Sequence, residues 1–169
     1  MTTSAPIGYQ TYRPYLNLLL DRMRDCLAGE EFLACALFGS VARDQARPDS
    51  DIDLLAVVSR RQADTMLRFV RFLREIETDP LVVELKASGL SADPYPVFVT
   101  PQDLESRPLI LLDILDHGII LCDTGVLRNR LDRLQRRLWE LGARKISHPD
   151  GTWHWDLKPD WKPGEVIEL

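Results

Sequence analysis

Apolar side chains recur along the chain with two different spacings. Steps of three and four residues, which place side chains on one face of a helix, run through residues 12–27, 63–76, 101–115 and 126–141. Segment 81–88 is compatible with either a strand or a short helix, and the glycine that follows it favours the helix. The pattern therefore predicts four amphipathic helices and a shorter fifth one.

Short apolar runs lie between these helices and are too brief to be helices themselves. They cover residues 32–38, 51–58, 97–100 and 118–122, and each indicates a strand. Prolines precede the third run, which favours a place at the edge of a sheet. A further short helix is expected to begin at Ser40, with its hydroxyl as the N-cap. The alternation of helices and strands predicts an α/β fold with a mixed, partly parallel sheet flanked by helices.

The C-terminal part of the chain differs in composition from the rest. Three tryptophans and three prolines fall between residues 148 and 169, which predicts an extended tail after the last helix. We expect one domain over residues 1–124, with a C-terminal basic helix and the tail packed on it over residues 125–169. Tryptophans suit contacts with the domain or with a second subunit, so a homodimer is an open alternative.

Composition narrows the class of protein without naming its function. The chain has 169 residues, 45% hydrophobic residues and a net charge of −5, which are ordinary values for a globular domain and argue against a wholly basic nucleic-acid binder. No apolar run has the roughly 20 residues that a membrane span needs, and the first residues lack the pattern of a signal peptide. The three cysteines lie among apolar neighbours, so we expect reduced thiols and a cytoplasmic protein.

Two aspartates stand at the start of the second apolar run. Side chains two residues apart on a strand point the same way, about 6.6 Å apart along the chain, so Asp51 and Asp53 are expected on one face. Two carboxylates that close repel each other unless a cation lies between them. Oxygen ligands in this number suit Mg²⁺, which completes its shell with water and phosphate. We therefore predict that Asp51 and Asp53 are metal ligands and catalytic residues.

A glycine, a serine and an arginine follow the first predicted strand. Glycine lets a phosphate group approach the backbone, and the free amides at a helix start together with the Ser40 hydroxyl can bind an anion. Arg43 lies one helical turn further on and suits either a phosphate contact or an ion pair with Asp44 or Asp51. We therefore predict that Gly39, Ser40 and Arg43 bind a nucleotide.

The two clusters together form a specific motif. The segments FGSVAR (38–43) and SDIDL (50–54) resemble the signature of the polymerase-beta-like nucleotidyltransferases, in particular the minimal nucleotidyltransferases. The resemblance implies a nucleotidyltransferase-like fold and Mg²⁺-dependent transfer of an NMP group from an NTP to an acceptor hydroxyl. It also implies that Gly39 and Ser40 hold the triphosphate. Minimal members often act in toxin–antitoxin pairs and modify a small helical protein partner, so a protein side chain is one candidate acceptor.

The sequence departs from the family pattern at one point. Family members usually add a third carboxylate from a neighbouring strand, but the strand expected to carry it has no acid, and Pro96 stands where the acid is expected. Glu84 is a substitute if its segment is a strand, and Asp93 is another. The alternative is therefore a catalytically weakened protein that binds a nucleotide or a partner, because the attacking hydroxyl lacks its base.

Positive charge is concentrated near the C-terminus. Seven basic and two acidic residues lie between residues 125 and 145, within a chain of net charge −5. Such a helix is typical of a solvated face with an apolar stripe beneath it, and this interpretation is favoured over RNA binding.

Overall fold

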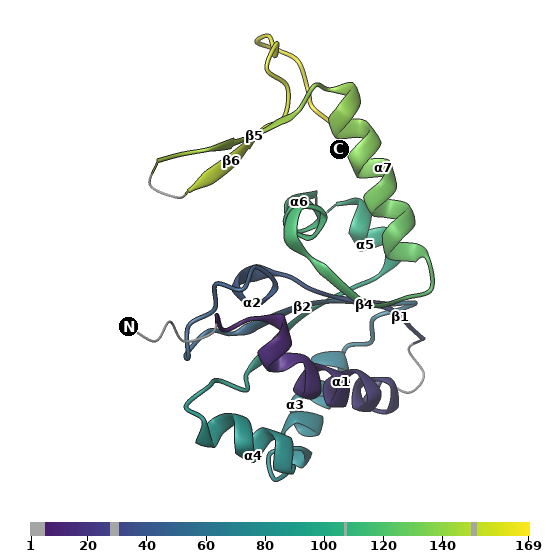
Figure 1. Ribbon diagram of the computed structural model, residues 1–169. Helices are drawn as coiled ribbons and strands as arrows, with labels where there is room; N and C mark the ends of the chain where they lie inside the picture. Colours follow the sequence, from purple (N-terminus) through teal and green to yellow (C-terminus); the bar gives the residue numbers. More distant parts are fainter. Residues whose placement is uncertain (1–5, 28–30, 107, 150–151) are drawn as a thin grey trace.

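A four-stranded sheet lies between two layers of helices in the computed structural model, which describes residues 6–27, 31–106, 108–149 and 152–169 (Figure 1). The sheet is formed by β1 (Phe32–Leu37), β2 (Ile52–Val58), β3 (Pro94–Val99) and β4 (Ile119–Asp123). The helices are α1 (Tyr9–Cys26), α2 (Gly39–Ala42), α3 (Thr65–Glu75), α4 (Pro80–Ala87), α5 (Pro101–Glu105), α6 (Pro108–His117) and α7 (Val126–Glu140). A separate hairpin follows, made of β5 (Arg144–Ser147) and β6 (Trp153–Asp156).

The sheet is mixed, as the sequence predicts. Its strand order is β3-β2-β1-β4, with β1 antiparallel to both β2 and β4 and with β2 parallel to β3. β3 therefore lies at an edge, which confirms the prediction from its prolines. Edge strands tolerate proline because an amide that points to solvent has no strand partner to lose.

The two faces of the sheet carry separate hydrophobic clusters. The first cluster contains Cys35, Leu37, Leu54 and Ala56 and lies against α1, α3 and α4 (Figure 1). The second contains the residues that alternate with these along β1 and β2, and it lies against α5, α6 and α7 (Figure 1). Side chains alternate between faces along a strand. Asp53, next to Leu54, therefore points to the face that α6 covers.

The structure corrects two of the expected elements. The segment 101–115 is two helices, α5 and α6, and the second begins at Pro108. Proline has no amide hydrogen to donate into a continuing helix, which accounts for the new start. The expected extended tail instead contains the β5–β6 hairpin. The apolar face of α3 is not fully covered, since Met66 is 49% exposed.

The helix predicted over 81–88 and the one predicted over 126–141 are confirmed as α4 and α7. Cys26, Cys35 and Cys122 are all free thiols, as expected. Within the described residues, no helix combines the length and the apolar character that a membrane span requires.

Candidate functional site

The chain reverses between β1 and β2 through a tight loop that contains Gly39. The Phe38 amide donates to the Asp53 carbonyl over 3.0 Å, which ties the loop to the start of β2. Gly39 has a φ of +72°, and a Cβ at this position would lie 2.0 Å from the Asp53 Oδ2 atom. A residue other than glycine would be strained by its backbone angle and would also collide with the carboxylate. Glycine thus allows the 39–42 backbone and the Asp53 carboxylate to share one small space.

Asp51 and Asp53 form a pair with unfavourable electrostatics. Asp51 is exposed just before β2, whereas Asp53 is the second residue of β2 and is half-buried. Burial raises the pKa of the Asp53 carboxyl above its usual range, the charge of Asp51 raises it further, and Arg43 opposes the rise. A bound cation would relieve this repulsion, and hard oxygen ligands fit a divalent ion such as Mg²⁺. Across the described residues, no group of three or more His, Cys, Asp or Glu side chains is arranged to hold a metal ion.

Arg43 pairs with a residue that the sequence did not identify. Its Nη1 donates to Asp113 Oδ1 over 2.8 Å, so the ion pair that the sequence offered as one alternative forms with Asp113 and not with Asp44 or Asp51. The other oxygen, Oδ2, accepts from the Gly39 amide over 3.2 Å. Asp113 lies on α6 and is also one of the charges that raise the pKa of Asp53. One carboxylate therefore binds both ends of the segment from Gly39 to Arg43.

The N-cap predicted at Ser40 is wrong. Ser40 is the second residue of α2, and the N-cap is Phe38, which makes no side-chain capping bond. Asp113 instead supplies a side-chain acceptor to the first amide of the helix, a task that a local Ser, Asp or Asn performs in many helices. The only sequence signal for Asp113 is that it is one of two acids, with Asp116, inside the apolar run that forms α6.

The residue opposite Asp53 on the neighbouring strand is a tyrosine. The register of β2 and β3 pairs Asp53 with Tyr95 and pairs Leu54 with Pro96. Pro96 therefore points to the opposite face, which corrects the expectation that it takes the place of the third acid. Tyr95 is 65% exposed on the side of the carboxylates.

Neither of the two proposed substitutes for the third acid lies on a strand beside Asp53. Glu84 lies on the helix α4, is exposed, and belongs to the layer of α1 and α3, across the sheet from Asp53 (Figure 1). The suggestion that Glu84 replaces the missing acid required a strand and is therefore wrong. Asp93 precedes β3, where its carboxylate accepts from the Ser91 hydroxyl over 3.0 Å.

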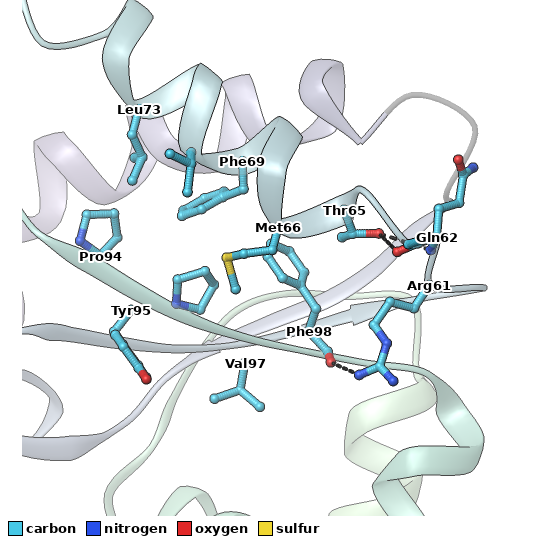
Figure 2. A pocket seen from close by; sticks show the side chains of 13 residues that line it. Arg61, Gln62, Thr65, Met66, Phe69, Leu73, Pro94, Tyr95, Val97 and Phe98 are labelled. Carbon is cyan, nitrogen blue, oxygen red and sulfur yellow. Dashed lines mark hydrogen bonds between the residues drawn. The ribbon is translucent and has the colours of Figure 1, made fainter.

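A cavity of about 640 Å³ lies between α3 and β3, on the far side of the sheet from the carboxylate pair. Met66 and Phe69 point into it from α3, and Phe98 closes it from β3 (Figure 2). Figure 2 shows Tyr95 and Val97 pointing away from α3. The cavity is thus formed by an incompletely covered helix and does not contain Asp51 or Asp53.

Much of the positive charge on α7 is engaged by the protein itself. Arg130 is buried, with its Nε 3.1 Å from Glu105 Oε2, and it donates to the Leu169 carbonyl over 3.2 Å. Arg133 also pairs with Glu105, and Arg137 donates to the Glu168 carbonyl over 3.0 Å. These arginines join α7 to α5 and the C-terminal segment, which leaves less free charge on the helix than its sequence suggests.

Comparison with known proteins supports one family. Residues 23–93 match the model of the polymerase beta nucleotidyltransferase family. This segment runs from the end of α1 to the residue before β3 and includes Gly39, Ser40, Arg43, Asp51 and Asp53. The resemblance deduced from the sequence is therefore confirmed over this segment. A search of curated proteins finds no match.

Several solved structures are similar over most of the chain at low identity. The spectinomycin adenyltransferase AAD(9) from Enterococcus faecialis, solved with ATP and spectinomycin, is 15% identical with a TM-score of 0.49, covering 79% of this chain and 67% of its own. A toxin–antitoxin structure with AMP-PNP is 11% identical with a TM-score of 0.43, and the match covers 72% of this chain and 87% of the other. The toxin–antitoxin MntA-HepT is 14% identical with a TM-score of 0.37, and the match covers 75% of this chain and 92% of the other.

Proposed function

Residues 23–93 carry a polymerase-beta-type nucleotidyltransferase segment, and from this premise we propose that the protein transfers an NMP group from an NTP to an acceptor hydroxyl. The observation that carries the proposal is the contact of Gly39 with Asp53. A Cβ on Gly39 would lie 2.0 Å from the Asp53 carboxylate, so the glycine loop and the acidic pair border the same space. A phosphate group bound to the loop would therefore lie beside the two carboxylates.

The proposed roles follow from where the side chains lie. Asp51 and Asp53 would hold a divalent cation, which we propose is Mg²⁺. When bound, this ion would neutralise charge on the triphosphate and favour loss of pyrophosphate. The Ser40 hydroxyl and the amides of α2 that follow Gly39 would donate to the triphosphate oxygens, because the Gly39 amide already donates to Asp113.

The transfer exchanges one phosphorus–oxygen bond for another. The acceptor oxygen bonds to the α-phosphorus as the bond from that phosphorus to the pyrophosphate oxygen breaks, and the hydroxyl proton is released. Asp51 and Asp53 orient the reacting groups, and catalysis would come mainly from positioning and charge stabilisation. The acceptor we propose is a hydroxylated small molecule or a protein side chain, and the latter would make a helical protein partner part of the reaction.

A second function is favoured by the register of the sheet. The position opposite Asp53 holds Tyr95 and no carboxylate, so a base for the acceptor hydroxyl is missing from the strand that usually supplies it. The alternative is a protein that binds a nucleotide, or a partner, without transferring the NMP group. Release of pyrophosphate in the presence of NTP and an acceptor distinguishes transfer from binding.

The first experiment is a thermal-shift titration with ATP, GTP, CTP and UTP, each with and without Mg²⁺. A ligand present at 100 times its dissociation constant should add about 2.7 kcal/mol of stability. We expect a Mg²⁺-dependent shift for at least one nucleotide, which Asp53→Asn abolishes. A well-folded wild type that shows no shift with any nucleotide would refute the proposal and its alternative as a nucleotide-binding protein.

A further inference from the structure

Asp113 makes two contacts with a loop that is distant in sequence. Its Oδ2 accepts from the Gly39 amide over 3.2 Å, and its Oδ1 accepts from Arg43 over 2.8 Å. The residues are separated by 74 and 70 positions, so the contacts depend on the docking of α6 over the end of β1. Only 20% of the Asp113 side chain and 25% of the Arg43 side chain are exposed, so water screens their ion pair only partly.

Gly39 is held between two carboxylates. Asp53 packs against its α-carbon, and Asp113 accepts from its amide. The position of Gly39 relative to the acidic pair is therefore fixed from two sides, by steric contact and by a hydrogen bond. α2 has four residues and no side-chain cap from its own sequence, so it needs this external acceptor more than a longer helix would.

The same contacts limit what Arg43 can do. Its guanidinium is directed to Asp113, and the Gly39 amide is engaged by the same side chain. A phosphate that took over both donors would leave the Asp113 carboxylate without these contacts and close enough to Asp53 to repel its charge. Phosphate recognition by Ser40 and its neighbouring amides avoids this cost.

We propose that Asp113 is a positioning residue that holds the 39–43 loop against Asp53 in the geometry for triphosphate binding, and that Arg43 acts through Asp113. The proposal rests on the proposed function and adds a residue from α6, which lies outside the segment that matches the family. The opposite arrangement is an internal competitor, in which Asp113 occupies the donors until a phosphate displaces it. The two arrangements predict opposite signs for the removal of the Asp113 charge.

The test is the dissociation constant of Mg²⁺·ATP, or of whichever NTP the wild type prefers, measured by titration calorimetry. Asp113→Asn should weaken binding about tenfold, which is the loss expected for one charge-assisted hydrogen bond. Arg43→Ala should weaken it to a similar extent. The double variant should be no weaker than either single variant, because both changes release the same loop.

Two further variants separate positioning from general loss of structure. Asp116→Asn removes an acid on the same helix that pairs with Lys145 and His117, and it should leave the dissociation constant within about twofold. Asp113→Glu keeps the charge and should bind more tightly than Asp113→Asn. A loss that also follows from Asp116→Asn, or a lack of rescue by glutamate, would overturn the proposal.

The outcomes distinguish this inference from the function on which it rests. A wild type that binds no nucleotide overturns the proposed function and this inference together. A wild type that binds, with Asp113→Asn binding equally or more tightly, overturns the inference alone and favours the internal competitor. Additive losses for Arg43→Ala and Asp113→Asn would also overturn it, because they would indicate that Arg43 contacts phosphate directly.

Discussion

Replacement of Gly39 by alanine tests whether the loop and the acidic pair share one space. Gly39 has a φ of +72°, which costs about 1–2 kcal/mol for a residue with a side chain. The lower entropy of the unfolded alanine chain offsets about 0.4–1 kcal/mol of this. The new methyl group would also lie 2.0 Å from Asp53 Oδ2, so the carboxylate or the loop must move. Such overpacking costs about 1–3 kcal/mol more.

The chain offers a matched control for this change. Gly89 has a φ of +77°, and a Cβ there would meet nothing within 4 Å. Gly89→Ala therefore carries the same backbone strain without the collision, and we expect it to lose about 1 kcal/mol. Gly39→Ala should lose about 2–4 kcal/mol, so the difference between the two variants measures the contact with Asp53.

The assay is equilibrium unfolding in urea, with the slope compared between variants to confirm that the unfolded state is unchanged. Nucleotide binding provides a second readout, because the displacement of Asp53 should abolish Mg²⁺-dependent binding in Gly39→Ala and leave it intact in Gly89→Ala. Equal losses of stability in the two variants, together with retained binding in both, would refute the close packing of loop and carboxylate.

Three further changes test the site and its support. Tyr95→Asp places a carboxylate opposite Asp53, and we expect tighter Mg²⁺ binding and faster pyrophosphate release, measured against Tyr95→Asn, which adds no charge. Burial and Asp51 raise the pKa of Asp53, so the fold loses stability as the pH rises from the ordinary pKa of aspartate through this raised pKa. Asp53→Asn should therefore raise the midpoint of thermal unfolding at pH 7, and the gain should vanish as the pH falls below about 3.9, the ordinary pKa of aspartate; a constant gain would contradict this cause. Phe69→Ala removes a ring that is 1% exposed and whose centroid lies 5.5 Å from that of the Phe98 ring, so the free energy of unfolding in urea should fall by about 3–5 kcal/mol. Its control is Trp139→Ser, at a side chain that is 84% exposed, which should change the free energy of unfolding by less than about 0.5 kcal/mol.

Local patterns were sufficient to predict most of the helices and strands and the main chemical motif. The spacing of apolar residues predicted α1, α3 and α7, because helix periodicity depends on neighbours within a few turns. The motif of Gly39, Ser40, Asp51 and Asp53 was also evident, since all four lie within one strand–turn–strand segment. The match of residues 23–93 to one family agrees with that motif.

The tertiary structure alone decided which distant residues complete the site. Asp113 reaches Gly39 and Arg43 only because α6 docks over the end of β1, and a contact across 70 or more positions has no local signal. The register of β2 and β3 likewise decided that Tyr95, rather than Pro96, stands opposite Asp53. A shift of one residue moves every side chain to the other face, so a sequence that predicts the strand does not by itself predict its partner residues.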